Sequence, residues 1–290
     1  MADEGSIFAD ANTNLSDAKV VILGVPFDGT SSHRSGSAQA PAEIRKESYN
    51  FESYLSKYKF DIENAPIHDI GNTKEFSSVS ELVARLPETI RECIVSDRFL
   101  ITIGGEHSIT LPIVKTHLEM HKPEDIGVIY FDAHLDFRES YLDEKYSHAC
   151  VARRLAELVG VQRIVSVGVR SYSAEEAEAL GNMKLRFYEA DVVNKSEIKK
   201  LINETLDYLN VKKIYLTIDM DVLDPAYAPG VGNPEYFGLT PWHLRDAIEI
   251  LAPSLIGADI VEVSPPYDNG NTAALAAQFI QILISNKLKD

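Results

Sequence analysis

Short apolar runs alternate with longer amphipathic stretches along most of the chain. The runs are rich in valine, isoleucine and aromatic residues, which is typical of parallel strands covered on both faces. We expect eight strands, at residues 19–25, 65–71, 99–103, 127–131, 163–169, 185–188, 213–218 and 255–263. This alternation predicts an α/β fold with a mainly parallel sheet.

The stretches between these runs carry apolar residues at helical spacing. From Ser78 to Ser96, leucine and isoleucine recur every four residues, which places them on one face of a helix. Thr240 followed by Pro241 has the form of an N-cap with proline at the first helical position. No Pro/Gly/Ser-rich linker divides the chain, so residues 1–290 are expected to form one three-layer α/β/α domain with about eight strands.

Composition and charge narrow the class of partner. Of 290 residues, 45% are hydrophobic and 25% charged, an ordinary globular composition. The formal net charge of −16 excludes nucleic acid as an expected partner, because nucleic acid selects for basic surfaces. An acidic protein can attract a cationic substrate, although such charge is also typical of a solvated surface.

Cysteine usage and the polar N-terminus bear on the compartment. Cys93 and Cys150 are the only cysteines, too few for a disulfide framework or a thiolate metal site. The first residues lack an apolar signal core, and no apolar run reaches the length of a membrane span. We therefore expect a soluble, cytoplasmic protein without a membrane partner.

Three predicted strands end in residue types that bind metal ions. Side chains alternate along a strand, so Asp132, His134 and Asp136 would share a face if the extended geometry continued, as would Asp219 and Asp221. In open α/β sheets, sites form outside the carboxyl ends of strands. The candidate ligands are His107, Asp132, His134, Asp136, Asp219 and Asp221.

The chemistry of these residues favours two divalent cations. Four carboxylates buried together repel one another unless cations offset their charge. Six ligands are too many for one four-coordinate zinc, and oxygen-rich ligation without thiolate favours Mn²⁺. Two such ions can share a water and lower its pKa toward about 7. Capping aspartates with an exposed histidine, or a metal that only stabilises the fold, are the alternatives.

With these residues assembled, the chain resembles the ureohydrolase family of arginases and agmatinases. The resemblance covers nearly the whole chain and rests on four motifs: Gly-Gly-Glu-His-Ser at 104–108, Phe-Asp-Ala-His-Leu-Asp at 131–136, Thr-Ile-Asp-Met-Asp-Val-Leu-Asp-Pro at 217–225 and Glu-Val-Ser-Pro-Pro-Tyr-Asp at 262–268. It implies an arginase-like fold, two Mn²⁺ per chain and a homo-oligomer, either a trimer or a hexamer.

The resemblance also assigns roles to individual residues. It implies one Mn²⁺ held by His107, Asp132, Asp136 and Asp219, and a second held by Asp132, His134, Asp219 and Asp221.

Three further roles follow from the same resemblance. Glu262 would receive the substrate guanidinium, His148 would carry protons to the leaving amine, and Asp221 would accept a proton during the reaction. Two carboxylate oxygens match the paired N–H groups of a guanidinium, and an imidazole suits proton transfer near neutral pH. Alanine follows His148 here where many family members carry glycine, and Glu262 or His148 could also be surface residues without a catalytic role.

The loop between Asp136 and His148 bears on the substrate. It lacks the Ser-Gly-Asn-type string with which arginases read a carboxylate, and it carries Glu139, Asp143 and Glu144. A cationic tail fits these acids, so we expect agmatine, cleaved to urea and putrescine. Arg138 could instead meet a carboxylate, which leaves 4-guanidinobutyrate open. N1-aminopropylagmatine and arginine also remain open.

Two other classes of protein use related features. A deacetylase-type hydrolase would use a single zinc ion and would not need the whole set of six ligands. A non-catalytic metal-binding subunit would keep the ligands without turnover. The number of metal ions per chain separates the first from a ureohydrolase, and turnover after metal loading separates the second.

Overall fold

Eight strands form one sheet in which every pairing is parallel. The computed structural model describes residues 7–95, 98–121 and 125–289. The order across the sheet is β4-β1-β5-β10-β9-β6-β7-β8. The strands are β1 (Val20–Val25), β4 (Ile67–Asn72), β5 (Phe99–Gly104), β6 (Ile126–Phe131), β7 (Ile164–Val169), β8 (Arg186–Glu189), β9 (Lys213–Asp219) and β10 (Leu255–Val261). The eight predicted strands are confirmed.

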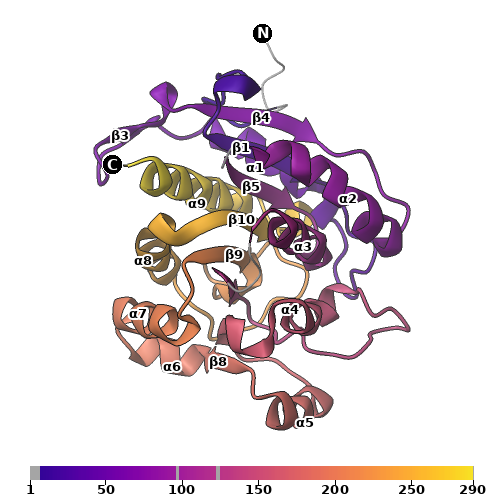
Figure 1. Ribbon diagram of the computed structural model, residues 1–290. Coiled ribbons are helices and arrows are strands. Elements are labelled where there is room, and N and C mark those ends of the chain that lie inside the picture. Colours follow the sequence, from indigo (N-terminus) through magenta and orange to yellow (C-terminus); the bar gives the residue numbers. More distant parts are fainter. Residues whose placement is uncertain (1–6, 96–97, 122–124, 290) are drawn as a thin grey trace.

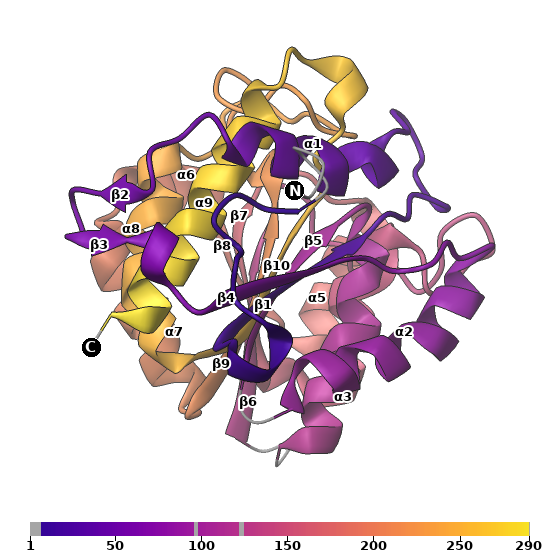
Figure 2. The same cartoon turned by 90° about the horizontal axis from the view of Figure 1, so that it is seen from above.

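Helices cover both faces of this sheet, as Figures 1 and 2 show. One layer consists of α1 (Ala40–Ser48), α7 (Ile198–Leu209), α8 (Pro241–Leu251) and α9 (Asn271–Leu288). The other consists of α2 (Val79–Cys93), α3 (Thr110–Met120) and α4 (Val151–Val159). The helices α5 (Ala174–Met183) and α6 (Ala190–Lys195) flank β8. This is the predicted three-layer α/β/α architecture.

Two apolar cores, one on each face of the sheet, hold these layers together. The first joins alternate residues of the strands to α1, α7, α8 and α9, and the second joins the opposite residues to α2, α3 and α4. Strands buried on both faces explain why their sequences are continuously apolar rather than alternating. Among the described residues, no helix is both long and apolar enough to cross a membrane.

A short hairpin after α1 and the six-residue helix α6 were not predicted. The two-residue strands β2 (Tyr54–Leu55) and β3 (Phe60–Asp61) form a small antiparallel hairpin. The six residues of α6 make fewer than two helical turns, too few to show a helical period. The helix predicted from Ser78 to Ser96 is α2, whose first turn is capped by the Ser78 hydroxyl accepting from Glu81 N–H. Ser96 lies outside the described residues.

The carboxyl ends of β5, β6, β9 and β10 meet at one edge of the sheet, here called the carboxyl edge. Gly105 follows β5 there, and its N–H donates to Val25 O. A Cβ at Gly105 would lie 2.0 Å from Phe27 O, so the close approach of two backbones requires glycine. The following residues thereby enter the edge beside β10 and β9.

Candidate active site

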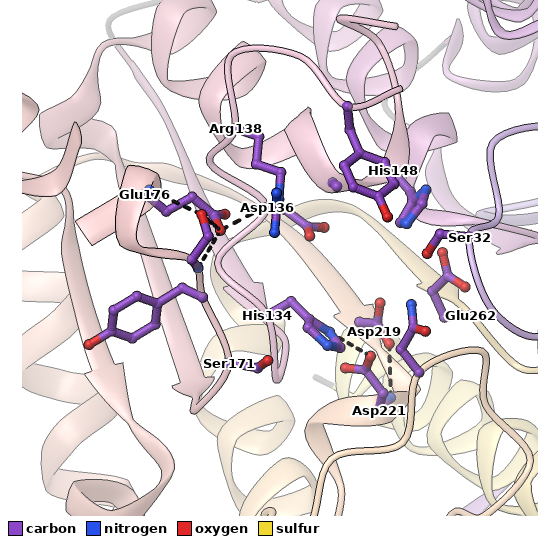
Figure 3. A pocket seen from close by; sticks show the side chains of 15 residues that line it. Ser32, His134, Asp136, Arg138, His148, Ser171, Glu176, Asp219, Asp221 and Glu262 are labelled. Atoms are coloured by element: carbon purple, nitrogen blue, oxygen red, sulfur yellow. Dashed lines mark hydrogen bonds and ion pairs between the residues drawn. The ribbon is translucent and has the colours of Figure 1, made fainter. Parts of the chain in front are cut away.

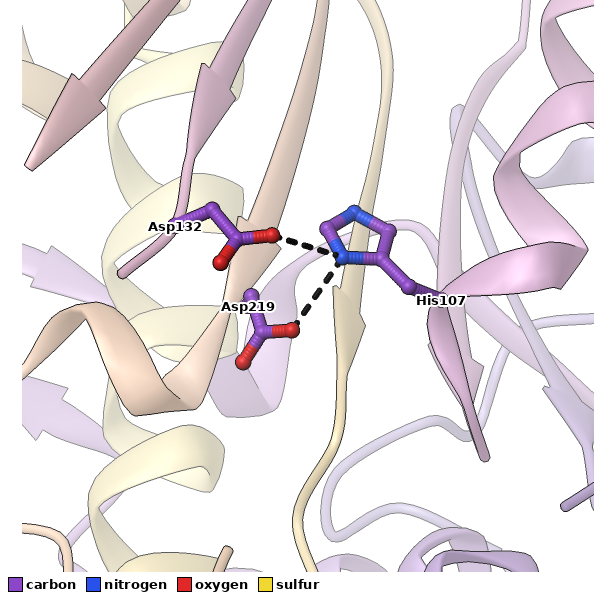
Figure 4. A group of neighbouring side chains, drawn as sticks. All are labelled: His107, Asp132 and Asp219. Atoms are coloured by element: carbon purple, nitrogen blue, oxygen red, sulfur yellow. Dashed lines mark hydrogen bonds and ion pairs between the residues drawn. The ribbon is translucent and has the colours of Figure 1, made fainter. Parts of the chain in front are cut away.

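His107, Asp132 and Asp219 form the first candidate metal-binding group (Figure 4). The Nδ1 atom of His107 lies 3.2 Å from Asp132 Oδ2 and 3.1 Å from Asp219 Oδ2. All three side chains are buried. Asp136 Oδ2 is 3.8 Å from the same nitrogen, so the structure brings this fourth predicted ligand beside the group.

Asp132, His134 and Asp221 form the second group. His134 Nδ1 lies 2.9 Å from Asp221 Oδ2 and 3.5 Å from Asp132 Oδ1. Asp132 thus belongs to both groups, with one oxygen on each side. The six predicted ligands therefore gather at one place on the carboxyl edge.

The backbone reaches this arrangement in a different way from the one expected. The extended geometry does not continue: β6 ends at Phe131, Asp136 has φ of 49°, and Asp221 lies in a 3-10 helix, Met220–Val222. Turns rather than a period of two bring the carboxylates together. Asp221 is held there because its Oδ1 accepts from Ala133 N–H and its own N–H donates to Asp219 Oδ1.

A buried chain of hydrogen bonds sets the tautomer of His107. The Thr217 hydroxyl donates to Asp259 Oδ1 at 2.5 Å, so it accepts from His107 Nε2–H at 2.8 Å. Asp259 also accepts from the hydroxyls of Tyr215 and Thr110. A neutral ring with its proton on Nε2 would turn the Nδ1 lone pair toward Asp132 and Asp219; burial alone would lower the pKa of His107, but the contacts and charges of these two carboxylates raise it well above its usual value. A second hydrogen bond of this kind commonly orients a metal-binding histidine.

The charges in this cluster fit the binding of cations. Burial and the charges of Asp221 and Asp132 raise the pKa of Asp219 well above its usual value. Burial and the charge of Asp132 likewise raise the pKa of Asp136. Asp132 Oδ2 is buried and receives no hydrogen bond from the described residues. Carboxylates that are costly to ionise together, with an oxygen and an imidazole lone pair to spare, are the donor set expected of a divalent-cation site.

A cavity of about 250 Å³ opens onto four of the six ligands (Figure 3). They are His134, Asp136, Asp219 and Asp221, whereas His107 and Asp132 lie buried behind them. Glu262 lines it, and its backbone has φ of 63°, which turns the chain sharply after β10. Glu262 Oε1 accepts from His107 N–H at 2.8 Å, whereas Oε2 receives no hydrogen bond from the described residues. Burial and the charge of Glu106 raise the pKa of Glu262 to about 8. One carboxylate oxygen is therefore available to a ligand in the cavity.

His148 also lines the cavity, and Thr30 orients it. The Thr30 hydroxyl donates to Glu106 Oε1 at 2.6 Å, so it accepts from His148 N–H at 3.0 Å and from His148 Nδ1–H at 3.1 Å. This leaves the lone pair of a neutral ring on Nε2. Burial lowers the pKa of His148 to about 4. Thr30 was not predicted, because nothing in a loop threonine distant in sequence marks it as a partner of His148.

Arg138 lies on the other side of the cavity from Glu262 (Figure 3). Its Nε is 3.6 Å from Glu176 Oε2 and its guanidinium stands over the Tyr141 ring at 5.1 Å. Glu176 is already engaged, since it accepts from Phe137 N–H and from Ser173.

The acids expected to receive a cationic tail lie elsewhere in the same loop. Among the described residues, those lining the cavity do not include Glu139, Asp143 or Glu144. Glu139 pairs with Arg153 and Arg154, and a Glu144 carboxylate oxygen accepts from Tyr146 N–H. The loop argument for a cationic tail is therefore not supported by the structure.

Three further residues that sequence reasoning missed support the site. Arg170 donates to several backbone carbonyl oxygens, including those of Asp221 and Glu235, and so joins two loops of the carboxyl edge. Glu235 Oε1 lies 3.6 Å from His134 Nε2. Tyr130 stacks on the His107 ring and donates to Asp136 Oδ2. A polar residue inside an apolar strand, as at Tyr130, was the available signal.

The sequence of this chain is similar to those of known proteins over nearly its whole length. The model of the Arginase family matches residues 18–285. An agmatinase from Bacillus cereus is 34% identical over 99% of this chain and 98% of its own length. An N(1)-aminopropylagmatine ureohydrolase from Thermococcus kodakarensis is 38% identical over 91% of this chain and 88% of its own.

A solved structure extends the match to three dimensions. The agmatine ureohydrolase of Thermoplasma volcanium superposes with a TM-score of 0.92 and 41% identity, over 98% of this chain and 94% of that one. With the motifs, the fold and these relatives in agreement, the chain belongs to the arginase family.

Proposed function

We propose that the chain is a binuclear manganese hydrolase that cleaves the guanidino group of agmatine to urea and putrescine, acting as a single domain. The observation that carries the proposal is the cavity that Glu262 and His148 line together with members of both groups of potential ligands, Asp219 of the first and His134 and Asp221 of the second. A guanidinium binder, a proton carrier and a cation-binding cluster around one space are the parts that this hydrolysis needs.

The ligands assigned to each cation follow the sequence expectation. His107, Asp132, Asp136 and Asp219 would hold one Mn²⁺, and Asp132, His134, Asp219 and Asp221 the other. When bound, the ions would supply positive charge that activates a water molecule for attack on the guanidinium carbon.

The chain's own side chains would bind the substrate and move protons. Glu262 Oε2 accepts an N–H of the guanidinium and thereby orients its carbon toward the ligand cluster. Asp221 accepts a proton from the attacking water. His148 Nε2 takes up a proton from solvent water and passes it to the amine nitrogen as the C–N bond breaks, and Asp221 then releases its proton to solvent. Guanidinium and water thereby give urea and ammonium with no net change in protons.

The substrate tail has support from two directions. The agmatinase from Bacillus cereus and the agmatine ureohydrolase of Thermoplasma volcanium favour agmatine, and the Thermococcus kodakarensis relative favours its aminopropyl derivative. Arg138 in the cavity wall favours a carboxylate tail instead, as in 4-guanidinobutyrate, because a cation there repels an ammonium group.

The test is urea release from the Mn²⁺-loaded protein with agmatine, N1-aminopropylagmatine, 4-guanidinobutyrate and arginine compared side by side. We expect the highest kcat/KM with agmatine. If the protein prefers 4-guanidinobutyrate and the Arg138→Gln variant loses that preference, Arg138 binds the carboxylate at the end of the substrate tail. No urea from any of them, with two metal ions per chain verified, would overturn the proposal.

Metal content and assembly are tested on the same sample. Two ions per chain are expected, whereas one zinc ion would favour a deacetylase-type reaction. We also propose that the chain forms a homo-oligomer, either a trimer or a hexamer. Light scattering measures the mass of the assembly directly.

A further inference from the structure

A second cavity, of about 160 Å³, lies at the opposite edge of the sheet, where the central strands begin. It is bounded by the starts of β5, β9 and β10, by the end of α3 and by the end of α9, elements labelled in Figure 1. We call it the basic pocket. Its polar lining consists of Arg98, His117, His121, Lys213 and Lys287.

His117 is the buried member of this pocket. Its side chain is 1% exposed, and neither ring nitrogen has a hydrogen-bond partner among the described residues. Burial, together with the charges of His121 and Lys213, lowers the pKa of His117 to about 3. The ring is therefore neutral at pH 7 and has one N–H group to donate. An unsatisfied buried donor is costly, so this N–H calls for an acceptor.

The ring of His117 is held in place by its neighbours. It packs on Tyr215, with ring centroids 5.4 Å apart, and against His121 at 6.2 Å. A Cβ at Gly257 would lie 2.8 Å from His117 Nε2, so glycine at this position makes room for the ring. The donor is thus fixed in the pocket wall.

Apart from the two histidines, the polar side chains of the pocket are those of two lysines and an arginine. Lys213 Nζ lies 2.8 Å from His121 Nδ1, and Lys287 Nζ donates to Leu255 O at 2.7 Å. Arg98 makes no hydrogen bond or ion pair within the described residues. Among the lining residues that the structure describes, none carries a carboxylate. Three cationic side chains with no acid paired to them among the described residues stand out in a chain of net charge −16.

Two simpler explanations account for only part of this combination of cations and a buried histidine. Helices end at this edge, and cations near helix C-termini are stabilised, which explains Lys287 at the end of α9. The helix dipoles do not explain why the buried ring nitrogens of His117 lack a hydrogen-bond partner among the described residues. His117 and His121, one helical turn apart, could also hold a transition metal, but the Lys213 ammonium occupies Nδ1 of His121 and would repel a cation.

We propose that the basic pocket binds a small tetrahedral oxyanion, inorganic phosphate or sulfate or the phosphate of a monoester, through the His117 N–H and the cations of Lys213 and Arg98. Cations and N–H donors around a small cavity match the charge and the acceptor oxygens of such an anion. The site is separate from the candidate active site and stands without the function proposed there.

Calorimetric titration of the full-length, Mn²⁺-loaded protein with sulfate and with phenyl phosphate, at constant ionic strength, tests the proposal. We expect saturable binding of one anion per chain. Tighter binding of sulfate would identify a free inorganic anion as the ligand, and tighter binding of phenyl phosphate would identify a phosphate monoester.

Variants locate the site. Lys213→Gln and His117→Phe are each expected to weaken binding about tenfold, the effect of losing one charge-assisted hydrogen bond. Lys199→Gln, on the exposed face of α7, is the matched control and should leave binding unchanged. Because His117→Phe could disturb packing, Lys213→Gln alone is sufficient. Absence of saturable binding, or equal binding by Lys213→Gln and the parent, would overturn the proposal.

Discussion

The two edges of the sheet carry opposite charge. At the carboxyl edge, Asp132, Asp219 and Asp221 surround two histidines. At the opposite edge, where the strands begin and which we call the amino edge, Arg98, Lys213 and Lys287 line the basic pocket together with His117. Both edges contain a buried histidine, but its setting differs. His107 has a hydrogen-bond partner on Nε2 and carboxylates around Nδ1, and His117 has no hydrogen-bond partner among the described residues.

The helix dipoles explain the direction of this difference but not its size. In a parallel α/β sheet the helices begin at the carboxyl edge and end at the amino edge, so acids are favoured at the first and cations at the second. Stabilisation by helix dipoles does not require two acidic side chains to lie close together. The ligand atoms of each group at the carboxyl edge lie within 4.8 Å of one another. Such crowding fits a cation-binding site better than helix capping.

Removal of one shared carboxylate should have the largest effect. Asp132→Asn takes a charge from both candidate groups, so we expect the second metal ion to be lost and urea release to fall about a thousandfold, equivalent to about 4 kcal/mol. Metal analysis and a urea assay measure the two effects. Asp191→Asn, an exposed aspartate on α6, is the control. Retention of two ions and full turnover would show that Asp132 is not a ligand.

Glu262→Gln isolates the proposed guanidinium contact. The amide oxygen can still accept from His107 N–H, but the carboxylate that a bound guanidinium would hold in its charged form is lost. We expect kcat/KM to fall about a hundredfold, equivalent to about 3 kcal/mol, with metal content unchanged. Steady-state kinetics measures this loss. An unchanged kcat/KM would remove Glu262 from the substrate site.

His117 should make the amino edge sensitive to acid. Its folded pKa, about 3, lies below the unfolded value of about 6.5. Below pH 6.5 the unfolded chain therefore binds a proton that the folded chain does not, and stability falls with pH until about pH 3. Between pH 7 and 5 this loss is about 2 kcal/mol.

Denaturant unfolding of the parent and His117→Phe at both pH values isolates that contribution, because the other titrating groups are common to both chains. The variant should lose about 2 kcal/mol less than the parent over this interval. Equal losses in the two proteins would contradict the buried, neutral state of His117.

Thr30→Val should show how far turnover depends on the orientation of His148, because the substitution leaves the histidine itself in place. The hydroxyl that accepts from His148 is lost while the shape is kept, so we expect kcat to fall about tenfold with little change in KM. Thr30→Ser restores the hydroxyl and should restore kcat. If Thr30→Ser were as slow as Thr30→Val, packing rather than the hydrogen bond would be responsible.

Gly257→Ala should have the smallest effect, confined to the amino edge. The added methyl would push against the His117 ring, and we expect a loss of about 1 kcal/mol in unfolding free energy. Weaker sulfate binding with unchanged urea release would accompany it. A loss of urea release without a change in sulfate binding would contradict the separation of the two edges.

The sequence predicted the sheet and the identity of the clustered ligands because both depend on local patterns. Buried parallel strands are continuous apolar runs, and the residues that follow them necessarily meet at one edge. It could not predict contacts between residues far apart in the chain. Thr30 meets His148, Arg170 fastens the loops at Asp221 and Glu235, and the basic pocket draws on three strands and two helices.

The same limit explains the misplaced loop acids. Charge composition suggested that Glu139 and Glu144 face the substrate, but their partners, Arg153 and the backbone at Tyr146, turn them aside. The direction in which a side chain points in an irregular loop depends on its neighbours in space, which a linear pattern does not reveal.

Asp136 and Glu262 share the left-handed backbone conformation, which is unfavourable for a residue with a side chain and natural for glycine. Glycine at either position would relieve that strain while removing a carboxylate from the carboxyl edge. Thermal stability and chemistry therefore make opposite demands on these two positions.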